Sequence, residues 1–336
     1  MLVEIGFWEA HPRKTLTLEY KLLKKRMIPT PPKRVWLLIG VSLVKAWSSL
    51  SPSSASSQSE AVAMLMSLGG PSVEEGTDSM KRSKRLFWVG AGAAYGLVYA
   101  APMISWYDWR SAKGWRWFDD GREWKQVDKV GHTWTTYQLS RIGYVSAQAA
   151  GYPSSQALWI GAALGWSYQA TIEIADGFFP KWGASLWDLA GNTAGSLLFL
   201  FRERVLERTS WDIELKFSFH WTPYAAQRPE VLGRGLSQIL KDYNGQTYWL
   251  CVYRKRWPVG LALGYGAGGL LGGYGEVPWP EIAARERRRW IVSVEPYWPF
   301  WIRRPQGGLI LVTSIKLPLP ALLYEARKVT LVGVYF

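Results

Sequence analysis

Asp128-Lys-Val-Gly-His132 opens the part of the sequence that decides the fold, which runs to residue 192. Two further polar groups follow at 169–177 and 188–192, set in apolar sequence rich in small residues. Polar residues within each group stand three or four positions apart, so each group shares one face of its own helix. Three such helices can bring a set of polar side chains to one centre: Asp128, Lys129, His132, Tyr137, Gln169, Glu173, Asp176, Asp188 and Asn192.

The composition points to a membrane surface. The 336 residues include 22 Trp and 17 Tyr, and the formal net charge is +14. Trp and Tyr favour the boundary between lipid and water, and a positive charge favours anionic partners. Because no zinc-knuckle, helix-turn-helix or RNP-like pattern occurs, we expect a membrane lipid or another anionic envelope component as partner, and no nucleic acid. The only cysteine, Cys251, excludes an intramolecular disulfide.

Residues 1–80 predict a signal-like segment followed by a disordered linker. Lys33 and Arg34 precede an apolar run at 35–44 and a small-residue tract at 48–57, which is the order of a secretory signal peptide. About ten apolar residues are too few to span a bilayer of about 30 Å. The alternative interpretation is a short hydrophobic tail without a targeting role. Ser, Gly and Glu dominate 48–79, as is typical of a disordered linker.

Residues 81–208 predict a bundle of four closely packed helices, which we expect to be membrane-associated. Glycines four positions apart, such as Gly92 with Gly96 and Gly191 with Gly195, allow close approach of neighbouring helices. The first helix is the best candidate for a membrane helix, and a buried helix of a soluble core is the alternative. The expected helices cover about 86–103, 124–149, 155–175 and 185–201.

Residues 209–336 predict an antiparallel β region packed on the bundle. From Ile213 to Trp221 large apolar residues alternate with polar ones, which is the pattern of a half-buried strand. The fold class is therefore α+β, a helical bundle followed by an antiparallel sheet that is partly barrel-like. Further strands are expected at 247–253, 259–266, 289–295, 308–316 and 328–335.

An ordered set of motifs resembles the YfiM-like predicted periplasmic lipoproteins of Gram-negative bacteria. The motifs are Asp-Lys-x-Gly-His at 128–132, Glu-x-x-Asp-Gly at 173–177 and Asp-x-x-x-Asn-x-x-Gly at 188–195, and the resemblance continues through 242–250 to the end of the chain. The helical half is also similar to VanZ-like membrane proteins. The resemblance implies a location in the cell envelope. We expect a membrane-associated protein that faces the periplasm, at the outer rather than the inner membrane. It implies no reaction, because neither group has an assigned activity.

Three interpretations of the polar centre are open. Paired polar groups can simply fix the register of the helices, without any chemistry. They can instead form a non-catalytic site for an anionic lipid or cell-wall fragment, with Lys129 and Lys181 contributing. As the alternative, a divalent cation such as zinc or manganese would activate water for hydrolysis of a phosphoester or amide. The metal ligands would then come from His132, Glu173, Asp176 and Asp188.

The sequence favours a non-catalytic protein over an enzyme. No His-x-x-x-His pair, no His-Glu-x-x-His motif and no nucleophile elbow occurs in the chain. His132 is the only histidine of the expected bundle, so any general acid–base scheme depends on it. A divalent cation is the one cofactor that the residue types of the centre would suit.

Overall fold

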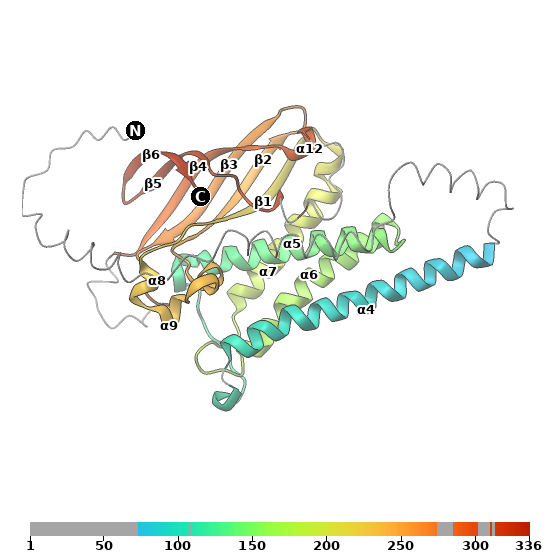
Figure 1. The fold of residues 1–336 in the computed structure, drawn as a ribbon, viewed down its shortest axis with the longest axis horizontal. Helices are drawn as coiled ribbons and strands as arrows, with labels where there is room; N and C mark the ends of the chain where they lie inside the picture. Colours follow the sequence, from blue (N-terminus) through green and yellow to red (C-terminus); the bar gives the residue numbers. More distant parts are fainter. Residues whose placement is uncertain (1–72, 108, 274–284, 302–309, 311–312) are drawn as a thin grey trace, which may run out of the picture. The chain divides into compact units, whose positions relative to one another are not determined.

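Four long helices come first in the structure, a computed structural model that describes residues 73–107, 109–273, 285–301, 310 and 313–336. The predicted signal segment lies outside the described residues. The first helix starts inside the stretch predicted to be a linker, so that prediction is wrong from residue 73 onward. The helices are α4 (Val73–Trp106), α5 (Val127–Ala149), α6 (Ser154–Asp176) and α7 (Leu186–Arg204) (Figure 1).

Glycines bring α5 into close contact with both α6 and α7. A Cβ atom at Gly161 of α6 would lie 2.5 Å from the carbonyl oxygen of Ser140 on α5. A Cβ atom at Gly191 of α7 would lie 2.8 Å from the carbonyl oxygen of Lys129. Such distances exclude any larger residue without movement of a backbone, so the predicted close packing is confirmed for these three helices.

Helix α4 lies against the others through tyrosines, and its glycines do not contribute. Nothing lies within 4 Å of a Cβ atom placed at Gly92 or Gly96, because both face away from the neighbouring helices. The hydroxyl of Tyr99 instead donates to the carbonyl oxygen of Thr171 at 3.2 Å. The prediction of four closely packed helices is therefore wrong for α4. In the described part of the chain, no helix has both the length and the apolar character needed to cross a membrane.

The chain continues into a six-stranded antiparallel sheet whose strand order is the order along the chain. The sheet is open, with β1 and β6 as its edge strands, so the partial closure expected from the sequence is replaced by an open sheet in the described residues. The strands are β1 (Trp211–Phe219), β2 (Gln246–Arg254), β3 (Val259–Gly268), β4 (Arg287–Pro296), β5 (Leu319–Glu325) and β6 (Lys328–Tyr335).

Five of the six predicted strands are confirmed, and the one at 308–316 is wrong. Ile310 and Thr313 are helical, and Ile315 forms a single parallel bridge to Phe217 of β1. The fifth strand begins at Leu319 instead, after a proline at residue 318. The apolar composition of 308–316 favours a strand, but composition alone does not separate a strand from another buried segment.

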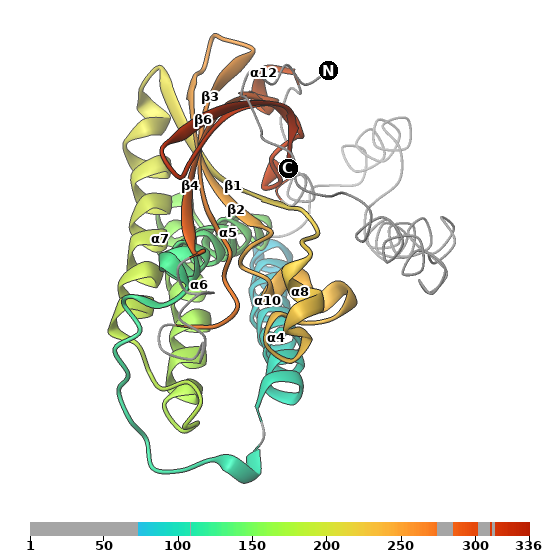
Figure 2. The same cartoon turned by 90° about the vertical axis from the view of Figure 1, so that its left-hand side faces the viewer.

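One face of the sheet carries large apolar side chains, and the other combines buried charged residues with a cluster of buried aromatic and small residues that includes Trp249, Tyr253 and Ala262. Helix α5 covers the apolar face at β1, where Gln138 Nε2 donates to the carbonyl oxygen of Leu215 at 2.6 Å. On the opposite face the ammonium group of Lys216 lies 2.8 Å from Glu295, and both side chains are fully buried. The sheet curls over these charges (Figure 2). The ring of Tyr335 on β6 therefore reaches that of Trp249 on β2, with 5.8 Å between the ring centroids.

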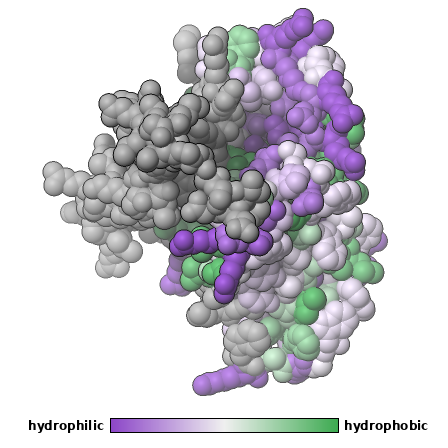
Figure 3. Space-filling view, turned by 90° about the vertical axis from the view of Figure 1, so that its right-hand side faces the viewer, coloured by the Kyte–Doolittle hydropathy of each residue, from purple (hydrophilic) through white to green (hydrophobic). Residues whose placement is uncertain are grey.

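Large apolar side chains also remain exposed on the helices. Leu186 and Leu197 of α7 are 64% and 59% exposed, and Trp159 of α6 is 56% exposed. Figure 3 shows the side of the molecule that lies at the right in Figure 1, where hydrophobic residues are scattered among paler ones. Single exposed apolar residues are common on proteins, whereas contiguous patches of them indicate an interaction surface.

Candidate functional site

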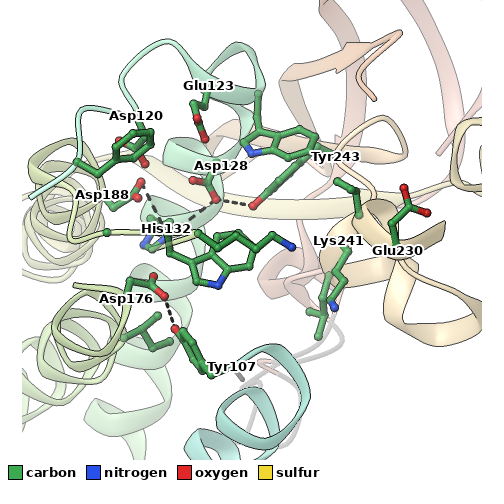
Figure 4. Close-up of a pocket in the computed structure, with 18 residues that line it drawn as sticks. Tyr107, Asp120, Glu123, Asp128, His132, Asp176, Asp188, Glu230, Lys241 and Tyr243 are labelled. Atoms are coloured by element: carbon green, nitrogen blue, oxygen red, sulfur yellow. Dashed lines mark hydrogen bonds and ion pairs between the residues drawn. The ribbon is translucent and has the colours of Figure 1, made fainter. Parts of the chain in front are cut away.

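A pocket of about 310 Å³ opens where the first turns of α5 and α7 meet the last turn of α6 (Figure 4). The short helices α9 (Pro229–Leu232) and α10 (Gln238–Lys241) line its other side. Ser185 caps α7 and accepts hydrogen bonds from the amides of Trp187 and Asp188, both at 3.1 Å. This cap fixes Asp188 in the first turn of α7, where the helix dipole favours a carboxylate.

His132 lies at the centre of the polar cluster, and its two ring nitrogens have different surroundings. Nδ1 lies 3.0 Å from Asn192 Oδ1 and 3.3 Å from Gln169 Nε2. Nε2 lies 3.9 Å from an oxygen of Asp128 and 3.9 Å from an oxygen of Asp188. The carbonyl oxygen of Asn192 favours a proton on Nδ1, and with that tautomer the neutral ring would turn its Nε2 lone pair toward the two carboxylates.

Lys129 neutralises part of the acidic charge. Its ammonium group lies 2.7 Å from Asp188 and 3.0 Å from Asp128, and it also contacts Asp120. Asp120 in turn accepts a hydrogen bond from the hydroxyl of Ser185. The pairing of Lys129 with Asp188, and of His132 with Asn192, connects α5 to α7 as the structural interpretation of the sequence expects.

The two carboxylates beside His132 differ in acidity. Burial would raise the pKa of Asp128, but Lys129 and His132 outweigh it and lower that pKa to about 2. Burial, followed by the charge of Asp128, raises the pKa of Asp188 to about 9. Burial lowers the pKa of His132, but the nearby carboxylates outweigh it and raise that pKa to about 9. Four carboxyl groups thus share Lys129 and His132 as their cations, those of Asp120, Asp128, Glu173 and Asp188.

Glu173 lies beside the other ring nitrogen of His132, and Asp176 is turned toward Tyr107. Glu173 accepts from the amide of Ser185 at 3.1 Å and lies 3.7 Å from Nδ1 of His132. Asp176 accepts a hydrogen bond from Tyr107, and burial raises its pKa to about 7 although that bond opposes the rise. Tyr137 lies outside the cluster, since its hydroxyl donates to the carbonyl oxygen of Ile213 in the sheet at 3.3 Å.

Several residues of the site were not expected from the sequence. Asp120 and Tyr107 come from the irregular segment between α4 and α5, where the only sequence signal is a run of aromatic residues. Tyr243 follows α10, and its hydroxyl donates to Asp128 at 2.6 Å. It belongs to the motif at 242–250 that carries the family resemblance, which is the one signal that points to it.

Asp128, His132 and Asp188 form a group of three residues that could hold a metal ion. One ligand atom from each lies within 4.8 Å of the other two. An ion equidistant from atoms at these separations would lie roughly 2.2–2.5 Å from each, slightly farther than the usual distances of about 2.0–2.2 Å for zinc with nitrogen and oxygen. The set differs from the predicted one, because Asp128 takes the place of Glu173 and Asp176.

Residues 114–204 match the family model described as predicted periplasmic lipoprotein (DUF2279). This range contains all of α5, α6 and α7, and therefore every metal-ligand candidate. The family resemblance is thus confirmed for 114–204, a narrower range than the motifs indicated, and it indicates an envelope, periplasmic location. No curated protein and no solved structure matches the chain.

Proposed function

We propose that this chain is a ligand-binding protein of the cell envelope whose helical bundle binds a divalent cation in the acidic pocket. The cation would be held by Asp128, His132 and Asp188, and zinc or manganese suits this mixture of nitrogen and carboxylate ligands. The protein would face the periplasm, at the outer membrane in preference to the inner one.

The observation that carries this proposal is the arrangement around Nε2 of His132. A histidine that only fixes helix register needs hydrogen-bond partners for both nitrogens. Here Nδ1 has a partner at 3.0 Å, whereas the nearest carboxylate oxygens lie 3.9 Å from Nε2, beyond hydrogen-bonding distance. An ion between the three groups would replace these long contacts with bonds, and Asn192 would orient the ring as the outer partner of a metal-bound histidine usually does.

Two lysines in the remainder of the pocket could hold an anionic ligand on the open side of the ion. Lys181 and Lys241 line the pocket together with the carboxylates. Desolvation, followed by the charge of Lys181, lowers the pKa of Lys241, as expected for an ammonium group that lacks a full solvent shell. A phosphate or carboxylate of a lipid or cell-wall fragment could contact the ion and the lysines together.

Calorimetric titration of the EDTA-treated protein with zinc and with manganese tests the proposal. We expect one ion per chain for the wild type and at least a tenfold weaker affinity for His132→Ala and for Asp188→Asn. Asp119→Asn is the matched control, because Asp119 is an exposed carboxylate next to the site. Equal affinities for wild type and both site variants would show that the ion binds elsewhere and that the centre is structural.

The second candidate is a metal-dependent hydrolase, and the lysines beside the metal-ligand candidates favour it. A metal with three protein ligands keeps a position for water, which it makes a stronger nucleophile. The metal-loaded protein should then hydrolyse an activated phosphodiester such as bis(p-nitrophenyl) phosphate, and Asp188→Asn should abolish the reaction. Tight metal binding without hydrolysis of phosphodiester or amide substrates would exclude the hydrolase, and metal binding would remain as the only proposed function.

A further inference from the structure

The apolar face of the sheet is covered at β1 and β2 but exposed from β3 to β6. Helix α5 lies against the covered part, where the ring centroids of Trp134 on α5 and Phe217 on β1 are 5.3 Å apart. Farther across the sheet, the aliphatic side chains on the same face are between 42% and 69% exposed: Leu261, Leu263, Val292, Val294, Leu322 and Leu331. We call these six residues, with the strands that carry them, the β3–β6 face.

Strand register places these residues in continuous rows. Leu263 pairs with Val292, Val292 with Leu322, and Leu322 with Leu331, so that one aliphatic row crosses four strands. Leu261 pairs with Val294 in the next row. Directly opposed residues in a sheet lie about 5 Å apart, so the rows form one contiguous patch rather than scattered residues. Contiguous exposed patches of this kind mark interaction surfaces.

One end of the β3–β6 face changes from aliphatic to aromatic to cationic. Trp290 pairs with Tyr324 in the row beside the aliphatic ones, and these side chains are 54% and 46% exposed. Beyond this aromatic row, on the same face of β4, stands Arg288, and Arg327 follows in the turn of the β5–β6 hairpin; both side chains are exposed. This order follows the change from hydrocarbon through the interface to the headgroups of a phospholipid leaflet.

The opposite end of the face is also aromatic and basic. Trp257 is 59% exposed in the turn between β2 and β3, next to the exposed Arg256. Arg254 is exposed too and lies over the ring of Trp211. A surface with an aliphatic centre and basic ends complements anionic headgroups around the hydrocarbon that the centre displaces.

These charges argue against a second copy of the chain as the occupant. Because both ends of the face are basic, any face-to-face pairing of two copies would bring arginines of one copy toward arginines of the other. Like charges brought together at an interface weaken association and suppress the wrong partner. An anionic surface has no such conflict, and the formal net charge of +14 acts in the same direction.

We propose that the β3–β6 face docks on the surface of an anionic phospholipid bilayer, with its aliphatic rows in the hydrocarbon and its basic ends among the headgroups. The proposal concerns a surface separate from the acidic pocket and does not depend on a bound cation. The helices that line the pocket are not part of the β3–β6 face. Either proposal can therefore fail without the other.

A fluorescent probe tests the position of the face directly. Cys251 is fully buried, so a cysteine introduced at Val292 is the one that reacts with an environment-sensitive dye. With full-length protein and vesicles of phosphatidylethanolamine and phosphatidylglycerol, we expect a blue shift at Val292→Cys and quenching by lipids spin-labelled in the acyl chain. The control is Leu236→Cys. Leu236 is 57% exposed and lies in the short helix Gly235–Ser237, outside the β3–β6 face, so a dye at this position should show neither the blue shift nor the quenching. An unshifted Val292 probe on vesicle-bound protein would overturn the proposal.

Vesicle flotation distinguishes the bilayer from other occupants. The double variant Leu263→Ser, Leu331→Ser should bind these vesicles at least tenfold more weakly than the wild type, while Leu236→Ser should bind equally well. Neutral phosphatidylcholine vesicles should bind the wild type more weakly than anionic ones. Unchanged binding by the double variant would refute the proposal. So would a wild-type dimer, seen by mass photometry without lipid, that the double variant lacks, because the face would then hold a second copy.

Discussion

Substitution of Gly195 by alanine should separate α7 from α5 and weaken both the fold and the site. A Cβ atom at Gly195 would lie 2.9 Å from the Cβ of Thr136 and 3.1 Å from the amide nitrogen of Tyr137, and closer still to the carbonyl oxygen of Thr133. Ordinary contacts begin at 3.4 Å, so the helices must move apart by several tenths of an ångström against backbone atoms. Such overpacking costs about 1–3 kcal/mol, whereas alanine in place of glycine stabilises an exposed helix by up to about 1 kcal/mol.

We therefore expect Gly195→Ala to lower the free energy of unfolding and Gly92→Ala to leave it unchanged or raised. Gly92 is the matched control, because it is also a helical glycine but nothing lies within 4 Å of its Cβ position. Urea unfolding followed by tryptophan fluorescence gives both values. The separation should also lengthen the 3.0 Å contact of His132 with Asn192 and reduce zinc affinity. Equal stability of the two variants would refute the packing of α5 on α7 described above.

Three further substitutions probe the pocket and the sheet. The raised pKa of Asp176, about 7, means that the folded state holds a proton which the unfolded chain releases near 3.8. The contribution of this group to wild-type stability therefore falls as pH rises from about 4 to 7. Asp176→Asn should remove that fall, which is worth at most about 4 kcal/mol. Urea unfolding at several pH values in the presence of EDTA measures it for the wild type and the variant. Parallel curves of unfolding free energy against pH for the two proteins would contradict the prediction. Tyr243→Phe should remove the 2.6 Å hydrogen bond to Asp128 and lower the free energy of unfolding by about 1–3 kcal/mol. An unchanged midpoint of urea unfolding would show that this hydrogen bond does not stabilise the protein. Lys216→Met leaves Glu295 buried with one fewer partner and should cost about 3 kcal/mol or more. An unchanged melting temperature would contradict a stabilising role for this buried ion pair.

The main elements of the fold could be predicted because two periodicities are clear in the sequence. Glycines four positions apart locate the contacts of α6 and α7 with α5, since only glycine lets helix backbones approach so closely. The alternation after Thr209 indicates the sheet. The same glycine spacing misleads at Gly92 and Gly96, because a small-residue stripe shows only that a close approach is allowed. Whether a neighbour fills the space depends on the tertiary structure.

The site was only partly predictable for a different reason. Spacing places Asp128, His132 and Asp188 on helix faces, but it does not fix the rotation of each helix or the direction of each side chain. Asp176 shares a stripe with Glu173 and yet turns to Tyr107, which comes from an irregular segment without periodicity. Contacts between a helix and a distant connecting segment carry no local signal, so such partners emerge only from the three-dimensional structure.

The central claim is that Asp128, His132 and Asp188 hold one divalent cation. Crystals of the full chain grown with manganese or zinc, with diffraction measured at the absorption edge of that metal, test it most directly. The claim predicts one anomalous peak in the pocket, about 2.0–2.5 Å from His132 Nε2 and from one oxygen of each aspartate. A metal-bearing crystal with its peak elsewhere, or with His132 Nε2 hydrogen-bonded to a carboxylate and no peak beside it, would contradict the claim.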